Sequence, residues 1–265
     1  GGHSHDKAVP PELWDEHPEY FALRAGQRAK PHPQCPQHCL SNPEVQKLIY
    51  AELLQHIDGG FDMVQLNQSD GYSPCECEQC QNLYDIRPAV PPSERDQYRQ
   101  DPCWGEKLWI MHRQMALQFQ KDRPGKKLCI MAYGPTRQPP RTFQDFPENT
   151  VIDLAPFNPE VAEKWRPYQV PGGFTVYLYN WGWYKPEGFL PKQNWEFCVE
   201  QVKAFYANNI KGIYRCGFGE LFGLEGPTYY IWCKLLDNPE LDINVLLQKY
   251  CRQAFGAAAE EMEKF

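Results

Sequence analysis

Short apolar runs alternate with amphipathic segments along nearly the whole chain, and this alternation restricts the fold more than any other feature. Runs with the length and composition of strands lie at residues 62–66, 127–133, 150–154, 174–179 and 212–216. Segments with helical periodicity lie at residues 43–58, 104–121, 159–165, 195–205, 228–236 and 243–255. Repeated strand–helix order indicates parallel strands joined by helical crossovers, so we predict an α/β fold.

The number of strands favours a TIM-type (β/α)8 barrel. A sixth strand is expected to end at Gly2-His3, before the five listed above. A closed barrel needs eight strands. We therefore expect the first two strands and most of the third to lie upstream, and residues 1–265 to form one partial barrel domain. The alternative is a doubly wound open sheet, which a Gly-rich phosphate loop after a strand would favour, and no such loop is present.

Composition argues against two classes of partner. The net charge is -7 and the pI is about 5.6, whereas binding to nucleic acid needs a concentrated basic patch. No apolar run approaches the roughly 20 residues that cross a bilayer, so we expect no membrane span in this chain. Aromatic residues make up 14% of the chain, and several lie in segments too polar to be core. Those residues suit stacking against a flat ligand.

Polar and aromatic residues follow almost every predicted strand. In a barrel, the loops at the carboxyl ends of the strands carry the functional groups. We therefore expect one face to gather residues of these loops, namely His3, Asn67, Asp70, Tyr133, Arg137, residues 179–184, Glu220 and Glu225.

Several motifs occur in order along almost the whole chain and are similar to a known family. They lie at residues 17–23 (HPEYFAL), 39–45 (CLSNPEV), 69–71 (SDG), 75–80 (CECEQC), 130–133 (IMAY) and 234–239 (KLLDNP). Together they resemble the bacterial domain-of-unknown-function family 4838. That family looks like glycoside hydrolase family 163, whose members are described as endo-β-N-acetylglucosaminidases of complex N-glycans. The barrel of that group is related to those of hexosaminidases and α-glucuronidases.

The resemblance implies a catalytic barrel domain that degrades an oligosaccharide or glycan, without a catalytic cofactor. The expected activity is that of a retaining, acetamido-assisted β-N-acetylglucosaminidase. A glycosidase of other specificity, such as an α-glucuronidase, and a non-catalytic carbohydrate-binding barrel are the alternatives. A metal-dependent hydrolase that uses the cysteine loop is a further alternative. A periplasmic or secreted location and an upstream domain of the same polypeptide are also expected.

Glycoside hydrolysis ordinarily needs two carboxyl groups, one to protonate the leaving oxygen and one to support the anomeric centre. Asp70 is the first candidate because it directly follows a strand, although Asp-Gly is also common in turns. Glu225 and then Glu220 are candidates for the acid, in a glycine-rich loop after the last predicted strand. Glu225 alternatively supplies a favourable charge at a helix start. Asp153 is a weaker candidate.

The expected sugar contacts are hydrogen-bonding and stacking residues of the same loops. His3 can bind sugar hydroxyls or, alternatively, be satisfied by neighbouring backbone. Aromatic faces suit the C–H face of a pyranose. The expected substrate-binding residues are His3, Asn67, Tyr133, Tyr179, Asn180, Trp181, Trp183 and Tyr184.

Three cysteines, Cys75, Cys77 and Cys80, lie in one short segment after Asp70, with Cys39 and Cys35 as possible partners. Three thiolates and a fourth from Cys39 can form a tetrahedral zinc site. Disulfides are the alternative in an exported protein, and unlinked thiols are the third possibility. A zinc ion held by four sulfurs is structural, because catalysis needs an open coordination position.

Overall fold

The structure is a computed structural model that describes residues 2–86, 102–179, 193–216 and 222–264. The chain divides into two compact units, Gly1–Thr175 and Val176–Phe265. Five strands are hydrogen-bonded in the order β3-β4-β5-β6-β7, which confirms the five strands predicted for the α/β fold. A closed barrel of eight strands stays a prediction, because the sheet among the described residues has five.

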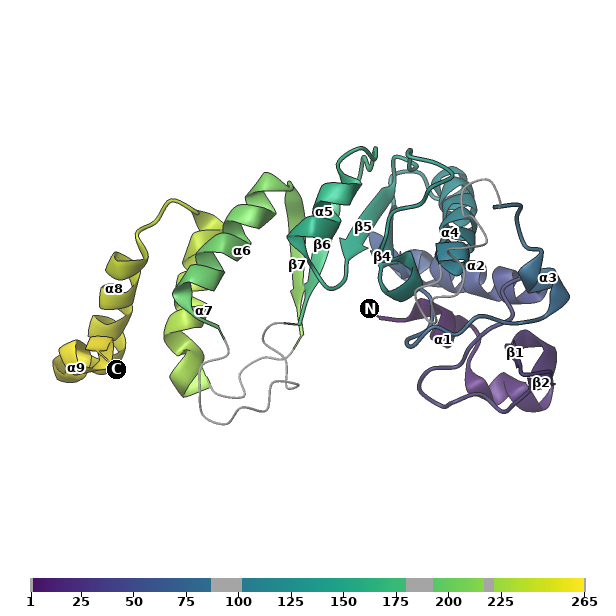
Figure 1. Cartoon of the computed structure of the whole chain (residues 1–265), viewed down its shortest axis with the longest axis horizontal. Coiled ribbons are helices and arrows are strands. Elements are labelled where there is room, and N and C mark those ends of the chain that lie inside the picture. Colours follow the sequence, from purple (N-terminus) through teal and green to yellow (C-terminus); the bar gives the residue numbers. More distant parts are fainter. Residues whose placement is uncertain (1, 87–101, 180–192, 217–221, 265) are drawn as a thin grey trace. The chain divides into compact units, whose positions relative to one another are not determined.

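The first unit is built on three strands, β3 (Met63–Leu66), β4 (Lys127–Ala132) and β5 (Thr150–Leu154) (Figure 1). They pair in parallel, with Val64 opposite Leu128 and Ile130 opposite Ile152. Every residue of β5 is buried, Thr150 and Asp153 included, as expected for a parallel strand covered on both faces. β6 (Phe174–Leu178) begins at the end of this unit.

The two long helices of this unit pack on the sheet through their apolar stripes. α2 (Pro43–Asp58) contacts β3 and buries Val45, Ile49, Leu53 and Ile57. Its first free N–H groups are capped by Asn42, whose side chain accepts from the Glu44 N–H. α4 (Pro102–Asp122) contacts β4, and α5 (Pro159–Trp165) has the predicted bounds.

The start of the chain differs from the prediction. Residues 2–3 are not a strand end among the described residues, and helix α1 (Ser4–Ala8) begins directly after them. The backbone of Gly2 is hydrogen-bonded to side chains and not to the backbone of a neighbouring strand. Its N–H donates to the Gln65 Oε1 atom at 2.8 Å, and its carbonyl accepts from the Asn67 Nδ2 atom at 2.8 Å. Side-chain amides of β3 and of the loop after it thus take the place of the backbone hydrogen bonds that a strand would make.

Several short elements were not predicted because none has a clear periodicity. A hairpin joins β1 (Leu23–Arg24) to β2 (Gln27–Arg28) through Ala25 and Gly26, whose φ angles of 47° and 76° suit a two-residue turn. The others in this unit are η1 (Pro11–Asp15), η2 (Pro18–Tyr20), α3 (Glu78–Gln81) and η4 (Gly134–Thr136).

The second unit is mainly helical. It holds most of β6, then α6 (Trp195–Ala207), β7 (Ile210–Arg215), α7 (Phe222–Asp237), α8 (Ile243–Phe255), η5 (Gly256–Ala258) and α9 (Ala259–Lys264). α6 packs on α7, α7 on α8 and α8 on α9. α7 begins before the predicted start at Thr228, and its early turns include Pro227.

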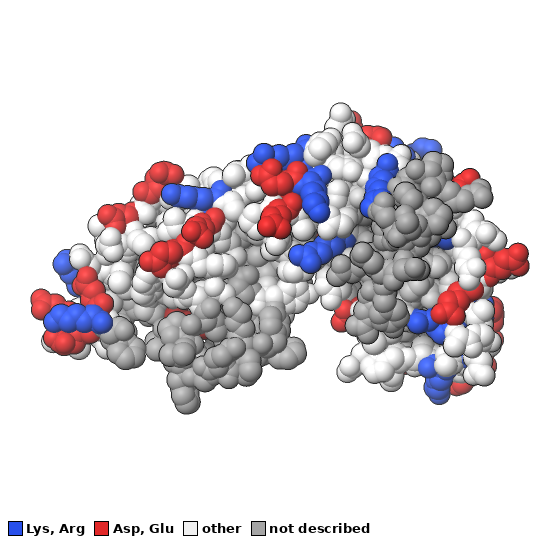
Figure 2. Space-filling view, viewed as in Figure 1, with Lys and Arg blue, Asp and Glu red and all other residues white. Residues whose placement is uncertain are grey.

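The described surface carries charges of both signs. Figure 2 shows Lys and Arg side chains interspersed with Asp and Glu on the face in view. None of the helices in the described ranges has an apolar stretch long enough to cross a bilayer.

Candidate functional site

Asp70 lies at the carboxyl end of β3, where the chain turns through Gly71 with a φ of 54°. Its side chain is 56% exposed. The Oδ1 atom accepts from the Gly71 N–H at 2.8 Å and from the Tyr133 hydroxyl at 3.0 Å. Tyr133 follows β4, the strand beside β3. Two adjacent parallel strands thus bring a carboxylate and a phenol together at the edge that sequence analysis predicted.

His3 is the third member of this group. Its Nε2 atom is 4.0 Å from the Asp70 Oδ1 atom, and its ring centroid is 5.9 Å from that of Tyr133. The Nδ1 atom lies 2.6 Å from the Gln68 carbonyl oxygen, which can accept but not donate. Nδ1 therefore carries a proton, and Nε2 faces the carboxylate. The side chain is 26% exposed. We call His3, Asp70 and Tyr133 the Asp70 cluster.

Buried amides hold the backbone beneath this cluster. Gln68 donates from Nε2 to the Tyr133 carbonyl at 2.7 Å and to the Thr136 hydroxyl at 2.9 Å. Asn67 accepts the Met131 N–H at 2.8 Å through Oδ1, while its Nδ2 atom donates to Gly2. Asn67 is 1% exposed, so its side chain holds the strand end in place, and its predicted sugar contact stays a prediction.

Gln37 ties the Asp70 loop to an earlier segment of the chain. Its side-chain Nε2 atom donates to the Asp70 carbonyl at 2.9 Å, and its Oε1 atom accepts from the Ser73 N–H at 2.8 Å. One amide therefore holds both sides of the turn.

Sequence analysis missed Asp6, which lies on α1 one helical turn after His3. Its Oδ1 atom is hydrogen-bonded to the hydroxyl of Ser69, the residue before Asp70. The Ser69 Oγ atom also lies 2.5 Å from the Pro36 carbonyl and 3.3 Å from the Nδ1 atom of buried His38. Partial burial raises the pKa of Asp6 to about 6. The His-x-His-Asp order at residues 3–6 carried the signal that could have found it.

The remaining predicted site residues are Asp153 in the first unit, two residues of the second unit, and residues outside the described ranges. Tyr179 is partly exposed, with its ring centroid 4.7 Å from that of Tyr177. Glu225 is 1% exposed, and its Oε2 atom lies 3.4 Å from the Tyr229 hydroxyl. Asp153, the weaker candidate, is buried and accepts from the Thr175 hydroxyl at 2.7 Å. Outside the described residues are Asn180, Trp181, Trp183, Tyr184 and Glu220.

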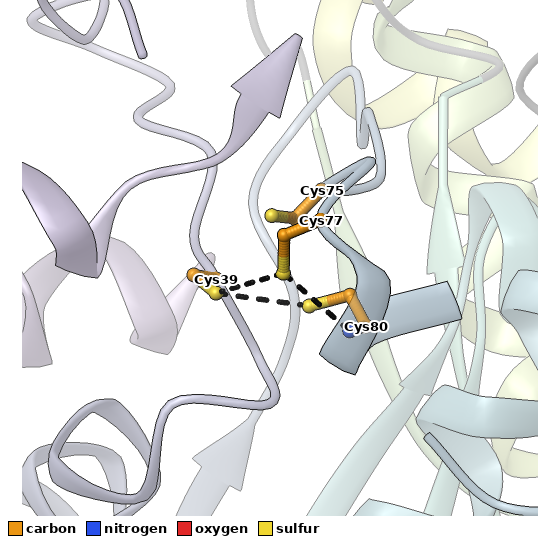
Figure 3. Close-up of side chains that lie close together, drawn as sticks. All are labelled: Cys39, Cys75, Cys77 and Cys80. Atoms are coloured by element: carbon orange, nitrogen blue, oxygen red, sulfur yellow. Dashed lines mark hydrogen bonds between the residues drawn. The ribbon is translucent and has the colours of Figure 1, made fainter. Parts of the chain in front are cut away.

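A second constellation lies in the first unit, where Cys39, Cys75, Cys77 and Cys80 are all buried (Figure 3). Their four sulfur atoms lie within 4.8 Å of one another. The Cys39 Sγ atom is 3.7 Å from those of Cys77 and Cys80. All four are free thiols, whereas a disulfide has sulfurs about 2.05 Å apart. This four-cysteine cluster, which sequence analysis predicted, can hold a metal ion.

Hydrogen-bond donors surround the four-cysteine cluster. Backbone N–H groups of Leu23 and Ser41 donate to the Sγ atoms of Cys75 and Cys80 at 3.2 and 3.4 Å. The Cys80 N–H donates to the Cys77 Sγ atom at 3.4 Å, at the start of α3. Hydrogen bonds with the Cys75 and Cys80 thiols lower the pKa of Cys39 well below its ordinary range. Such donors stabilise thiolates, the form that binds metal.

The sequence matches the family described as "Domain of unknown function (DUF4838)" over residues 1–265. The chain belongs to this family. No curated protein matches the DUF4838 chain. Among solved structures, it is similar to a mutant O-GlcNAc hydrolase of Thermobaculum terrenum, with a TM-score of 0.47 and 12% identity. The similarity covers 85% of the DUF4838 chain and 47% of that protein, so the chain spans about half of its length.

Proposed function

We propose that this DUF4838 chain is a glycoside hydrolase domain of the acetamido-assisted β-N-acetylglucosaminidase type. The Asp70 cluster is the observation that carries the proposal. An exposed carboxylate at the carboxyl end of a parallel strand is held by a phenol from the next strand and faced by an imidazole. Functional groups of barrel enzymes lie at this edge, and we infer that the sheet belongs to a (β/α)8 barrel. The resemblance to glycoside hydrolase family 163 supports the same chemistry.

Each member of the Asp70 cluster suits a step of such a reaction. In the acetamido-assisted reaction, the Asp70 carboxylate orients and polarises the 2-acetamido group of the sugar as that group attacks the anomeric carbon and displaces the leaving oxygen, which takes a proton from the acid. The Tyr133 hydroxyl fixes the position of the Asp70 Oδ1 atom at 3.0 Å. His3, whose Nε2 atom faces the same carboxylate, is placed to bind a sugar hydroxyl.

Screening against a glycan panel tests this proposal. Purified full-length protein and its Asp70→Asn variant are incubated with complex N-glycans, aryl β-N-acetylglucosaminides and an aryl α-glucuronide. Release of product by the wild type from the first two classes, and its loss in the variant, is the expected result. Turnover of the glucuronide alone would favour the α-glucuronidase alternative. Tight glycan binding without turnover would favour the carbohydrate-binding barrel.

The acid that protonates the leaving oxygen is proposed to be Glu225, with Glu220 as the second candidate. Replacing Glu225 with Gln is expected to lower kcat by about 10²–10⁴ on substrates with poor leaving groups, the range of general acid catalysis. An activated aryl glycoside should be affected far less, because its leaving group needs no proton. The measurement is kcat on both substrates, with Glu196→Gln on exposed α6 surface as the matched control. Equal losses on both substrates would move the assignment to Glu220.

We also propose that the four-cysteine cluster holds a structural zinc ion. A zinc ion bonds to thiolate sulfur at about 2.3 Å, so the sulfurs of a tetrahedral site are about 3.8 Å apart. The separations of 3.7 Å from Cys39 to Cys77 and Cys80 fit this value. Because four buried thiols supply all four positions, the metal-dependent hydrolase alternative gains no support from this cluster.

A further inference from the structure

The hydroxyl of Ser69 has more acceptors around it than it has protons. Its Oγ atom is hydrogen-bonded to the Asp6 Oδ1 atom and lies 2.5 Å from the Pro36 carbonyl oxygen. The Nδ1 atom of His38 is a third neighbour at 3.3 Å. A serine hydroxyl donates one hydrogen bond, and a carbonyl oxygen cannot donate at all. One of the other two neighbours must therefore supply a proton.

His38 does not supply it. Its Nε2 atom lies 2.9 Å from the Val9 carbonyl, which can accept but not donate, so the ring proton is on Nε2. Its Nδ1 atom, at 3.3 Å, is also the most distant of the three neighbours of the Ser69 Oγ atom. Asp6 remains as the donor.

We propose that Asp6 is a positioning residue that keeps its proton in mildly acidic solution and, through Ser69, holds the loop that carries Asp70. The protonated carboxyl donates to the Ser69 Oγ atom, and the Ser69 hydroxyl then donates to the Pro36 carbonyl. This inference rests on the proposed function insofar as it concerns activity. Asp70 follows Ser69 directly in the chain. Holding the backbone of Ser69 in place therefore also sets the direction of the Asp70 side chain.

The surroundings of Asp6 also favour its protonated form. Partial burial raises its pKa to about 6, and the negative charge of Asp70 adds to this effect, while His3 and the hydrogen bond that Ser69 can donate to the ionised carboxylate oppose it. Two carboxyls in one site avoid ionising together, so the nearby charge of Asp70 favours the protonated form of the more buried Asp6. The titratable groups near Asp6 on its own helix and on the packed segments are His3, His5, Cys35, His38 and Asp70.

Loss of the Asp6 proton has a defined structural consequence. The Ser69 hydroxyl can then donate either to the Asp6 carboxylate or to Pro36, but not to both. The hydrogen bond to Pro36 is the weaker of the two, because hydrogen bonds to charged acceptors are stronger. The Ser69–Pro36 hydrogen bond is therefore lost as the pH rises through the pKa of Asp6, while the Gln37 hydrogen bonds to the same loop remain.

Thermal unfolding against pH tests the proton on Asp6 without any substrate. The folded state binds this proton between the ordinary pKa of 3.8 and about 6, so the wild type loses stability as the pH rises through that window. Asp6→Asn keeps a neutral donor and lacks the ionisation. We expect its Tm relative to the wild type to increase from pH 4.5 to pH 7.5. Asp15→Asn, on the exposed surface of η1, is the matched control and should show no such trend.

The activity profile tests the positioning role. We expect wild-type kcat/KM to fall roughly tenfold for each pH unit above the pKa of Asp6. Asp6→Asn should match the wild type at pH 5 and lack this fall.

A Tm difference independent of pH, or lower stability of Asp6→Asn at pH 7.5, would overturn the protonated state. An inactive Asp6→Asn with the expected Tm trend would overturn the positioning role. A wild type inactive on every glycan refutes the proposed function and leaves the Tm result to decide on Asp6.

Discussion

Replacing Asp70 with Asn is expected to lower kcat/KM by about 10²–10³ on both natural glycans and activated aryl glycosides, the range found when one electrostatic contact to a reacting centre is lost. The amide has the shape of the carboxyl and can still accept from the Tyr133 hydroxyl and the Gly71 N–H. It lacks the negative charge that polarises the group attacking the anomeric carbon. Because the lost charge acts on the attacking group and not on the proton that the departing oxygen receives, both substrates slow alike.

Two variants separate this effect from loss of folding. Asp62→Asn makes the same substitution just before β3, at the opposite end of the strand, where the carboxylate is exposed and paired with Lys126 at 2.7 Å. It should leave kcat/KM unchanged. Tyr133→Phe removes one hydrogen bond to Asp70 and should cause a smaller loss than Asp70→Asn. Full activity of Asp70→Asn with an unchanged Tm would remove Asp70 from the mechanism.

Loss of the metal from the four-cysteine cluster is expected to produce the largest change in stability. Replacing Cys77 with Ser should reduce the free energy of unfolding by about 4–5 kcal/mol or more, the range typical of a lost metal site. A tetrahedral site that loses one thiolate binds its ion far more weakly, and three buried thiols are left without a partner. Denaturant unfolding, with metal content measured by mass spectrometry on the same sample, checks the result.

Cys198→Ser is the matched control. Cys198 is fully buried in α6 and lies outside the four-cysteine cluster. Placing a hydroxyl there costs about 1–3 kcal/mol, while zinc content should stay at one ion per chain. A wild-type protein without bound metal, in which the four cluster thiols react independently with an alkylating reagent, would contradict the zinc site.

Local sequence patterns were sufficient for the elements that are long or continuously apolar. β5 was predicted at residues 150–154 because Val151, Ile152 and Leu154 make this a short and mainly apolar run. α2 was predicted from the capping residue Asn42 and from the apolar stripe that follows it. The predicted strand end at Gly2 was wrong because its hydrogen bonds go to Gln65 and Asn67, partners more than sixty residues away. No local pattern records such partners.

The same distinction holds for the candidate site. Asp70 and Tyr133 could be predicted because each directly follows a strand and parallel strands end at one edge. The four-cysteine cluster could be predicted from the close spacing of three cysteines, with Cys39 as their partner. The His-x-His-Asp order marks Asp6 as part of a polar group, but its role could not be predicted, because that role depends on a hydroxyl at residue 69 and a carbonyl at residue 36. Only the tertiary fold brings the Ser69 hydroxyl and the Pro36 carbonyl close to the Asp6 carboxyl.

The amide of Gln37 has a consequence for protein engineering. It spans from the Asp70 carbonyl to the Ser73 N–H, so a segment far earlier in the chain determines the shape of the Asp70 turn. Two residues further along, Cys39 joins the cluster with Cys75, Cys77 and Cys80. A chimera built between relatives cannot therefore exchange residues 69–80 alone. Residues 35–41 form the other half of the same module, and the two segments must be transplanted from one parent together.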